Sequence, residues 1–546
     1  MATDAFAPFR LRSRSALAEA EATAAEAGAS PLVVDPSEPL PAGMTSRTLA
    51  LLPASAAAGA EEACRAADGS VAGVPGHERP CLHAAPFRRR LAEQGLAAVV
   101  AGHAGVLIDR PDAALSLGLF GAGFSDACLG AFLANLRRDY GSQFEPLDMR
   151  RLAAEALALA PGAVTFDHIH FGRDFWRFRN ESLAEALAAL VQPLRDAARA
   201  ARRPFAIAGA FESAGPAPFA CARHLDGAVF PLHGGGTGLA AGRLWRAVLG
   251  RRGAAAALPA GTAPADAARL AAGLACSGVG IAFDEPELAE VLRPTTRLLR
   301  EHVERRAGLA FGEPVAECAV LYSAESDLWT QGVHRAAVEE AGEALARAQV
   351  QWSVALSPAG VRPGTVLVLA QAAALSPGEA AGVRRFLESG GAVLAMGPPG
   401  QVDASGRPVA PFLPEGRPSG LRVGDGTLVS LPPLAPGGAE VEPVARAVET
   451  LRPKGARAAE VTAPTPVLAS LWRSPKRLDA HLVALGHEPV QDATLFLSDD
   501  VAAGARRARF RSASGLDEKL AVHPGRRSLS AVLPPFRGYA VLSLVP

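Results

Sequence analysis

The sequence predicts an α/β fold: a (β/α)8 TIM barrel, then a flavodoxin-like α/β domain, then a small C-terminal β-sandwich. Over roughly the first 310 of its 546 residues, short apolar runs alternate with long segments at helical spacing. A smaller strand–helix series begins near Pro314. From about Gly400, Pro and Gly become dense and the helical periodicity fades. We therefore expect domains at residues 1–312, 313–458 and 459–546.

The barrel prediction depends on seven apolar runs that are too short for helices. Short continuous apolar runs are typical of parallel strands covered by helices on both faces. The predicted strands are Pro31–Asp35, Thr48–Pro53, Gly105–Asp109, Pro204–Gly209, Gly227–Pro231, Ala254–Leu258 and Gly278–Phe283. The predicted helices include Pro86–Gln94, Ser125–Asp139, Phe175–Ala201 and Pro264–Ala275. The eighth strand is expected near Ala163–Phe166, and a doubly wound open sheet is the competing interpretation.

The predicted flavodoxin-like domain has a similar alternation on a smaller scale. Its expected elements are strands Ala319–Ser323, Thr365–Ala370 and Ala392–Met396 and a helix at Gln331–Ala348. A second helix should begin after Ser376, because Ser376, Pro377 and Glu379 form the pattern of an N-cap with a capping box. Gly390 suits the left-handed end of that helix.

The last part of the chain has short strands without helices between them. They are Gly426–Leu431, His481–Leu485, Thr494–Leu497 and Tyr539–Leu544. Strands separated by turn residues, from about residue 460 to the end, predict the β-sandwich.

Composition and charge exclude several classes of function. Lys and Arg together number 55, and so do Asp and Glu, so the formal net charge is zero. Non-specific nucleic-acid binding needs a basic excess. The sequence has neither a polybasic patch nor an apolar run near the ~20 residues of a membrane-spanning helix, and its first ten residues do not form a secretory signal. We expect a cytoplasmic protein that binds neither nucleic acid nor membrane.

The six cysteines are scattered along the sequence. They are Cys64, Cys81, Cys128, Cys221, Cys276 and Cys318. None belongs to a C-x-x-C pair, so we expect neither a disulfide framework nor a zinc site. Each is expected to be a small buried apolar residue. No metal or other cofactor is predicted.

A series of motifs runs in order along almost the whole chain. The motifs are Cys81–Arg88, Gly105–Pro111, Phe124–Cys128, Phe132–Leu136, Tyr140–Gly141, Asp174–Ser182, Val320–Trp329 and Phe386–Leu394. Together they resemble the β-galactosidases of glycoside hydrolase family 42 and their uncharacterised relatives. The resemblance implies a barrel with a carbohydrate-facing site and a glutamine-amidotransferase-like middle domain. That middle domain mediates trimers in the family, so a homo-oligomer is implied as well.

The sequence departs from this family at both catalytic positions. The family has its acid/base Glu two residues after the Asp that Asp109 resembles, and here Pro111 stands there. Its nucleophile Glu should follow the strand Ala254–Leu258, where this chain reads Pro-Ala-Gly-Thr. The middle domain also lacks the Cys-His-Glu set of an active amidotransferase. The resemblance therefore implies the architecture and, less directly, a carbohydrate site, but not β-galactosidase activity.

Candidate site residues follow from the position of strand ends. Functional residues of such barrels lie at the carboxyl ends of the strands, and glycoside hydrolysis normally uses two carboxylates. The catalytic candidates are Asp109, Glu285 and Glu212, and the substrate-binding candidates are His83, Asp112, His233 and Asp284. The structural alternatives are a loop anchor for Asp109 and first-turn helix acids for Asp284 and Glu285.

Three hypotheses about function follow. The first is a glycoside hydrolase that acts on an oligosaccharide or polysaccharide by carboxylate acid/base chemistry without a metal. The second is a non-catalytic carbohydrate-binding or assembly protein on a degenerate glycosidase scaffold, and the third is a barrel hydrolase or lyase with a non-sugar substrate. Carboxylate geometry separates the first two hypotheses: a separation of ~5–5.5 Å indicates a retaining glycosidase and ~6.5–9.5 Å an inverting one, whereas the absence of a second acid within ~10 Å of Asp109 would count against a hydrolase.

Overall fold

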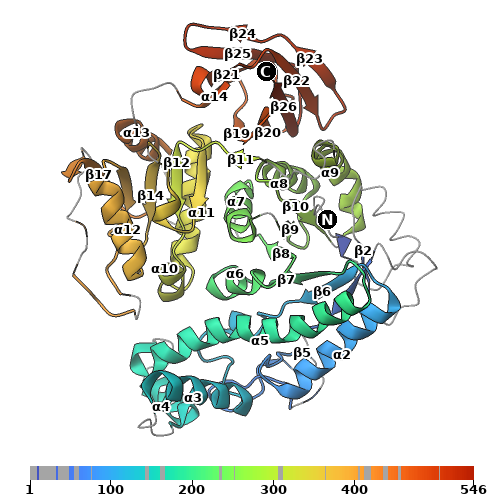
Figure 1. Cartoon of the computed structure of the whole chain (residues 1–546), viewed down its shortest axis with the longest axis vertical. Helices are drawn as coiled ribbons and strands as arrows, with labels where there is room; N and C mark the ends of the chain where they lie inside the picture. Colours follow the sequence, from blue (N-terminus) through green and yellow to red (C-terminus); the bar gives the residue numbers. More distant parts are fainter. Residues whose placement is uncertain are drawn as a thin grey trace. The chain divides into compact units, whose positions relative to one another are not determined.

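A computed structural model gives the fold of the chain (Figure 1). The described residues are 9–10, 32–34, 48–54, 59, 61–74, 77–141, 147–159, 166–232, 236–250, 252–283, 285–304, 312–362, 364–403, 406–410, 413, 420–434, 441–452, 457–502 and 504–545. They form two compact units, one built mainly from Pro31–Pro231 and the other from Leu232–Pro546. The expected domain boundaries at 312 and 458 stay a prediction.

The first unit is built on parallel strands whose order follows the sequence. The strands are β1 (Phe9–Arg10), β2 (Leu32–Val34), β3 (Thr48–Leu52), β6 (Gly105–Asp109), β7 (Ala206–Ala210) and β8 (Gly227–Pro231). Their helices are α2 (Ala85–Ala101), α3 (Asp126–Tyr140), α4 (Met149–Leu159), α5 (Gly172–Ala200) and α6 (Pro216–Ala222). A doubly wound sheet reverses its strand order at a switch point, and this sheet does not.

The second unit continues the strand–helix alternation. Its elements here are β9 (Gly253–Ala257), which is parallel to β10 (Gly280–Ala282), and α7 (Leu239–Leu249), α8 (Pro264–Cys276) and α9 (Ala289–Glu304). The predicted TIM-barrel topology is confirmed, but its eighth strand is the unpredicted β1. Of the segment expected to supply that strand, residues 163–165 lie outside the described residues, and Phe166 begins a 3-10 helix, Phe166–His168.

The flavodoxin-like fold that follows is also confirmed. Its sheet has the order β13-β12-β14-β15-β17-β16, and all pairs are parallel except β16 with β17. The strands are β12 (Cys318–Leu321), β13 (Trp352–Ala355), β14 (Val366–Ala370), β15 (Ala392–Met396), β16 (Leu421–Val423) and β17 (Gly426–Leu431). The helices are α10 (Ala324–Trp329), α11 (Val333–Arg347), α12 (Pro377–Glu388) and α13 (Val441–Leu451).

Two apolar cores cover the faces of this sheet. Residues of α11 and α13 pack on one face, and residues of α12 pack on the other (Figure 1). The predicted capping box is present: the backbone N–H of Glu379 donates to Ser376 Oγ at 3.2 Å, and the backbone N–H of Ser376 donates to Glu379 Oε2 at 2.8 Å. The strand Gly426–Leu431 belongs to this sheet.

The C-terminal β-sandwich has two antiparallel sheets. One has the order β11-β19-β20-β26-β22-β23, with strands β11 (Glu313–Pro314), β19 (Val467–Ser474), β20 (Arg477–Ala484), β22 (Arg507–Ser512), β23 (Asp517–Leu520) and β26 (Tyr539–Val545). The other has the order β18-β21-β25-β24, with strands β18 (Ala459–Thr462), β21 (Ala493–Ser498), β24 (His523–Pro524) and β25 (Ser528–Leu533). The short helix α14 (Asp499–Ala502) follows β21. No helix in the described part of the chain is long and apolar enough to cross a bilayer.

Candidate functional site

Two predicted acids, Asp109 and Glu212, lie at the carboxyl ends of neighbouring strands. Asp109 is the last residue of β6, where all five residues are buried. In the parallel register of β6 and β7, Asp109 pairs with Ala210, and Glu212 lies two residues beyond. Because carboxyl ends of parallel strands share one edge of the sheet, both carboxyl groups belong to the same edge, where barrel enzymes place their active sites.

The chain turns sharply directly after Asp109. Arg110 has a φ of 49°, the left-handed region that non-glycine residues rarely adopt. Its backbone N–H donates to the carbonyl of Ala210 at 2.6 Å, and its Nε lies 3.5 Å from Asp109 Oδ2. Such backbone strain persists where surrounding contacts impose it, and it is frequent at functional sites. The Asp109 carboxyl group is only 4% exposed and is fixed by this turn.

Glu212 is the more accessible of the two acids, with a side chain 25% exposed. Its Oε1 accepts hydrogen bonds from Arg79 Nη2 at 3.0 Å and from Ser116 Oγ at 3.2 Å. Its Oε2 accepts no hydrogen bond from the described residues. Both donors act on Oε1 and so orient the carboxyl group, while Oε2 is buried. Arg79 and Ser116 are absent from the residues that the sequence predicts for the site.

Asp112 is fully buried and joins the loop after β6 to the loop after β7. Its carboxylate accepts hydrogen bonds from the backbone N–H groups of Glu212 and Ser213, each at 2.9 Å, and from Ser213 Oγ at 2.8 Å. Burial raises the pKa of Asp112 to about 6, against the opposing effect of these hydrogen bonds. These hydrogen bonds fix the backbone at Glu212, and Asp112 therefore helps to set the position of the Glu212 side chain.

Of the candidates that follow residue 231 in the sequence, the structure describes one, Glu285. Glu285 belongs to the second unit, where its Oε1 accepts a hydrogen bond from the backbone N–H of Gly261 at 2.7 Å. His233 and Asp284 lie outside the described residues.

His83 lies beside a cluster of three buried cysteines, Cys64, Cys81 and Cys128. Their sulfur atoms all lie within 4.8 Å of one another, and Cys81 and Cys128 are 3.1 Å apart. His83 Nδ1 is 3.4 Å from Cys128 Sγ, and its ring stacks on Phe178. The expectation of scattered, isolated cysteines is wrong for these three. They are far apart in the sequence, and only the packing of α3 against the segment before α2 brings them together.

The cluster favours negative charge on the sulfur of Cys81, whereas hydrogen bonds with Cys128 and Cys81, together with burial, raise the pKa of Cys64. Hydrogen bonds from the Cys128 and Cys64 thiols lower the pKa of Cys81, helped by His83 and by the Ser125 hydroxyl, which donates to Cys81 Sγ at 3.1 Å. Burial alone would lower the pKa of His83, but the Cys128 and Cys81 sulfurs outweigh it and raise that pKa to about 10. Thiolates are the form in which cysteine binds metal ions.

The donor set of this cluster fits a structural zinc ion. Zinc takes four ligands in a tetrahedron, with Zn–S distances of ~2.3 Å, which places sulfur atoms about 3.8 Å apart. Sulfurs already within 4.8 Å need only small shifts. His83 lies outside this set of mutually close ligand atoms, so its Nδ1, 3.4 Å from Cys128 Sγ, would have to shift to supply the fourth ligand. In this position the ion would tie the segment before α2 to the first turn of α3.

We predict that the purified protein contains about one zinc ion per chain, measured by elemental analysis. Alanine at Cys64, Cys81 or Cys128 should abolish that content, because each removes one thiolate. Cys221→Ala is the matched control, since Cys221 is also fully buried but lies on α6, outside the cluster. A metal-free protein in which thiol titration detects a Cys81–Cys128 disulfide would contradict the prediction.

The cluster and the strand-end acids are connected through one short segment. Arg79 donates to Glu212, and Cys81, two residues later, belongs to the cysteine cluster. The backbone N–H of Cys81 also donates to the carbonyl of Glu62 at 2.7 Å, while the Glu62 carboxylate is held by Arg90. Contacts that hold Cys81 in place therefore also restrict Arg79, which orients Glu212.

Comparison with known proteins identifies the architecture. No family model matches the chain, and no curated protein matches it. The β-galactosidase of Bacillus circulans sp. alkalophilus is 12% identical with a TM-score of 0.66, over 99% of this chain and 98% of that one. A GH42 β-galactosidase from G. stearothermophilus is 12% identical, with a TM-score of 0.65 and coverage of 99% and 98%. The α-L-fucosidase isoenzyme 2 of Paenibacillus thiaminolyticus is 11% identical, with a TM-score of 0.63 and coverage of 99% of both chains. From end to end, this chain thus has the fold of the family 42 β-galactosidases that its sequence resembles.

Proposed function

We propose that the protein is a glycoside hydrolase that acts on an oligosaccharide or polysaccharide and that Asp109 and Glu212 are its two reacting carboxyl groups. The observation that carries this proposal is their position at the same edge of the sheet, on the neighbouring strands β6 and β7. Hydrolysis of a glycosidic bond normally uses one carboxylic acid to protonate the leaving oxygen and one carboxylate as nucleophile or base.

The contacts of the two acids suggest how the roles divide. Glu212 has the more exposed side chain of the two, and its Oε1 accepts two hydrogen bonds that orient the carboxyl group, which suits a nucleophile or base. Asp109 is then the acid that protonates the leaving group. Asp112, which is fully buried and bound to two backbone N–H groups, has a structural role in this scheme. His83, the other predicted substrate-binding residue in this unit, is assigned to the cysteine cluster.

The test is a screen of aryl glycosides, beginning with β-galactosides and α-fucosides, and of polysaccharides. We expect turnover by the natural chain and a loss of about 10²-fold or more in kcat for both Asp109→Asn and Glu212→Gln. Glu181→Gln is the control, because Glu181 is 62% exposed on α5 and pairs only with Arg177 among the ion pairs of the described residues. Equal turnover by all four proteins would remove both acids from the mechanism.

A specific observation favours a second candidate, a non-catalytic carbohydrate-binding or assembly protein. Pro111 occupies the position of the family's acid/base Glu, and no acid follows β9 in the stretch from Leu258 to Thr262. On this alternative, the screen finds no turnover of any glycoside. Calorimetry then detects binding of a saccharide, and Glu212→Gln weakens that binding. The screen therefore separates the two candidates.

We also propose a homo-oligomer, a trimer by resemblance, and a cytoplasmic location. All six cysteines are buried and unpaired by disulfides, which suits a reducing compartment. Light scattering at micromolar concentration measures the assembly, and a clean monomer would contradict it.

A further inference from the structure

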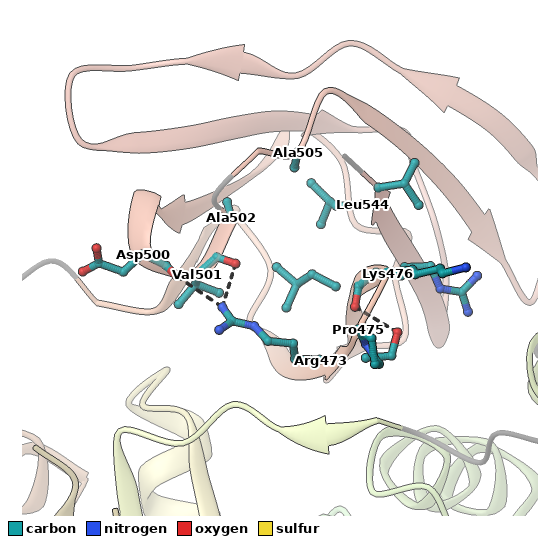
Figure 2. Close-up of a pocket in the computed structure, with 12 residues that line it drawn as sticks. Arg473, Pro475, Lys476, Asp500, Val501, Ala502, Ala505 and Leu544 are labelled. Atoms are coloured by element: carbon teal, nitrogen blue, oxygen red, sulfur yellow. Dashed lines mark hydrogen bonds between the residues drawn. The ribbon is translucent and has the colours of Figure 1, made fainter. Parts of the chain in front are cut away.

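The β-sandwich contains a cavity of about 210 Å³ that the barrel chemistry does not use (Figure 2). It lies between the β19–β20 hairpin, whose turn is Pro475–Lys476, and the segment around α14. The Arg473 guanidinium spans the two: its Nη2 donates to the carbonyls of Val501 at 2.9 Å and Asp500 at 3.3 Å (Figure 2). Arg473 thus holds α14 against the hairpin and keeps the cavity open on one side.

The charged groups that line the cavity are mainly cationic. They are Arg473, Lys476 and Arg477, and the single acid among the lining residues is Asp500. Figure 2 shows the Asp500 carboxylate directed away from the cavity, while its backbone carbonyl faces Arg473. The side chain of Lys476 is exposed in the turn and forms no ion pair with the described residues. The cavity therefore has a surplus of positive charge at its rim.

Arg477, the second arginine of the lining, adds to this positive potential. Arg477 pairs with Asp479 at 3.0 Å, and partial burial, together with repulsion from Arg511, lowers its pKa to about 10. Arg511 is close enough to Arg477 to repel it, and the buried Asp479 carboxylate pairs with Arg477. An incoming anion is thus attracted by more cations than the neighbouring acids neutralise.

The rest of the lining is aliphatic. Leu478, Ala502 and Leu544 are buried, and Val501 and Ala505 are partly buried. The volume equals about seven water molecules at ~30 Å³ each. It lies below the ~300–1,000 Å³ of pockets that enclose drug-sized ligands. The ligand is therefore small, with an apolar saturated face and one negative group.

We propose that this cavity binds a carboxylate carried on a compact saturated body, with the anion at Arg473 and the body against Val501 and Leu544. A uronic acid unit of a glycan and a free short-chain or alicyclic carboxylic acid share this chemistry. The site lies in the β-sandwich and is independent of the proposed reaction at Asp109 and Glu212, so either can fail without the other.

The test is isothermal titration calorimetry of the full chain at low ionic strength with three probes: glucuronate, cyclohexanecarboxylate and neutral glucose. We expect saturable binding of at least one carboxylate. Affinity should fall as salt is added, because exposed charges are screened. Binding of glucuronate alone would identify an acidic sugar as the ligand, and binding of cyclohexanecarboxylate alone a free carboxylic acid. Equal binding of glucose and glucuronate would overturn the role of charge.

Substitutions test whether the carboxylate binds in this cavity. Lys476→Gln should raise the dissociation constant about two- to fivefold, because it removes an exposed cation from the rim of the cavity. Lys519→Gln is the matched control, because it makes the same change on exposed β23 of the same sandwich, away from the cavity. Ala505→Phe should fill the cavity and abolish binding. The proposal is wrong if no carboxylate binds, or if Lys476→Gln and Ala505→Phe bind as tightly as Lys519→Gln.

Discussion

Replacing Asp479 by alanine is expected to lower the free energy of unfolding of the β-sandwich by about 3–5 kcal/mol, since removal of one partner from a buried ion pair leaves the other charge uncompensated. Asp479 lies on β20 and has no exposed surface. Its carboxylate pairs with Arg477 Nε at 3.0 Å, accepts a hydrogen bond from Ser543 Oγ at 2.7 Å, and lies 3.7 Å from His302 Nε2.

The same carboxylate also stabilises groups that it does not touch. Arg511 Nη2 donates to His302 Nδ1 at 2.9 Å, and His302 packs edge-on against His481, which is bonded to the Tyr539 hydroxyl at 2.6 Å. Asp479 is therefore the negative centre of a buried network that joins α9 to the β20–β26–β22 sheet. In its absence, Arg477 and Arg511 would repel each other across a space closed to water.

The measurement is chemical denaturation followed by a probe of the sandwich, with Asp517→Ala as control. Asp517 forms a bidentate pair with Arg509 on the same sheet, but both side chains are exposed, 34% and 53%. Exposed pairs contribute only about 0–1 kcal/mol. A double variant, Asp479→Leu with Arg477→Met, should recover part of the loss because it removes both charges. If Asp479→Ala and Asp517→Ala unfold alike, the network does not stabilise the fold.

The strands that the sequence predicts well are those whose residues are all apolar. β6 is predicted residue for residue, since GVLID is apolar up to a charged last residue and every position is buried. β22 was missed because it reads RARFRS: Ala508 and Phe510 face the core, Arg507 and Arg509 are exposed, and the charged Arg511 is buried. β1 has only two residues, too few for any pattern. Apolar runs therefore revealed β6 and not the short or charged strands, and β19 was missed as well, although its first six residues are buried.

Some residues of the candidate site can be predicted from the local sequence, and others are brought to it only by the fold. Asp109 and Glu212 could be predicted because a strand end is a local property of the sequence. Arg79, which orients Glu212, lies 133 positions earlier in the chain and belongs to no strand or helix. The Cys64, Cys81 and Cys128 cluster is hidden for the same reason, because its spacing matches no short metal motif. Contacts between distant segments are set by tertiary packing, which no local pattern encodes.

The buried carboxylate of Asp112 should make the loop that holds Glu212 less stable as the pH rises. Its folded pKa of about 6 lies above the 3.8 of an unperturbed aspartate, so folding favours the protonated form. The stability from Asp112 is therefore fully present below pH 3.8 and is lost as the pH rises through about 6. A shift of about two pKa units corresponds to about 3 kcal/mol between these limits.

Hydrogen exchange of the peptide that contains Glu212 and Ser213 measures this effect locally, because their backbone N–H groups donate to Asp112. After correction for intrinsic exchange rates, the opening free energy of the natural chain should fall between pH 4 and 7, and that of Asp112→Asn should not. Asp226→Asn is the matched control: Asp226 also accepts a backbone N–H of β7, from Ile207 at 2.9 Å, but is 46% exposed. Parallel pH profiles for the natural chain and Asp112→Asn would show that the Asp112 charge does not destabilise the loop, and the position of Glu212 would then be independent of pH.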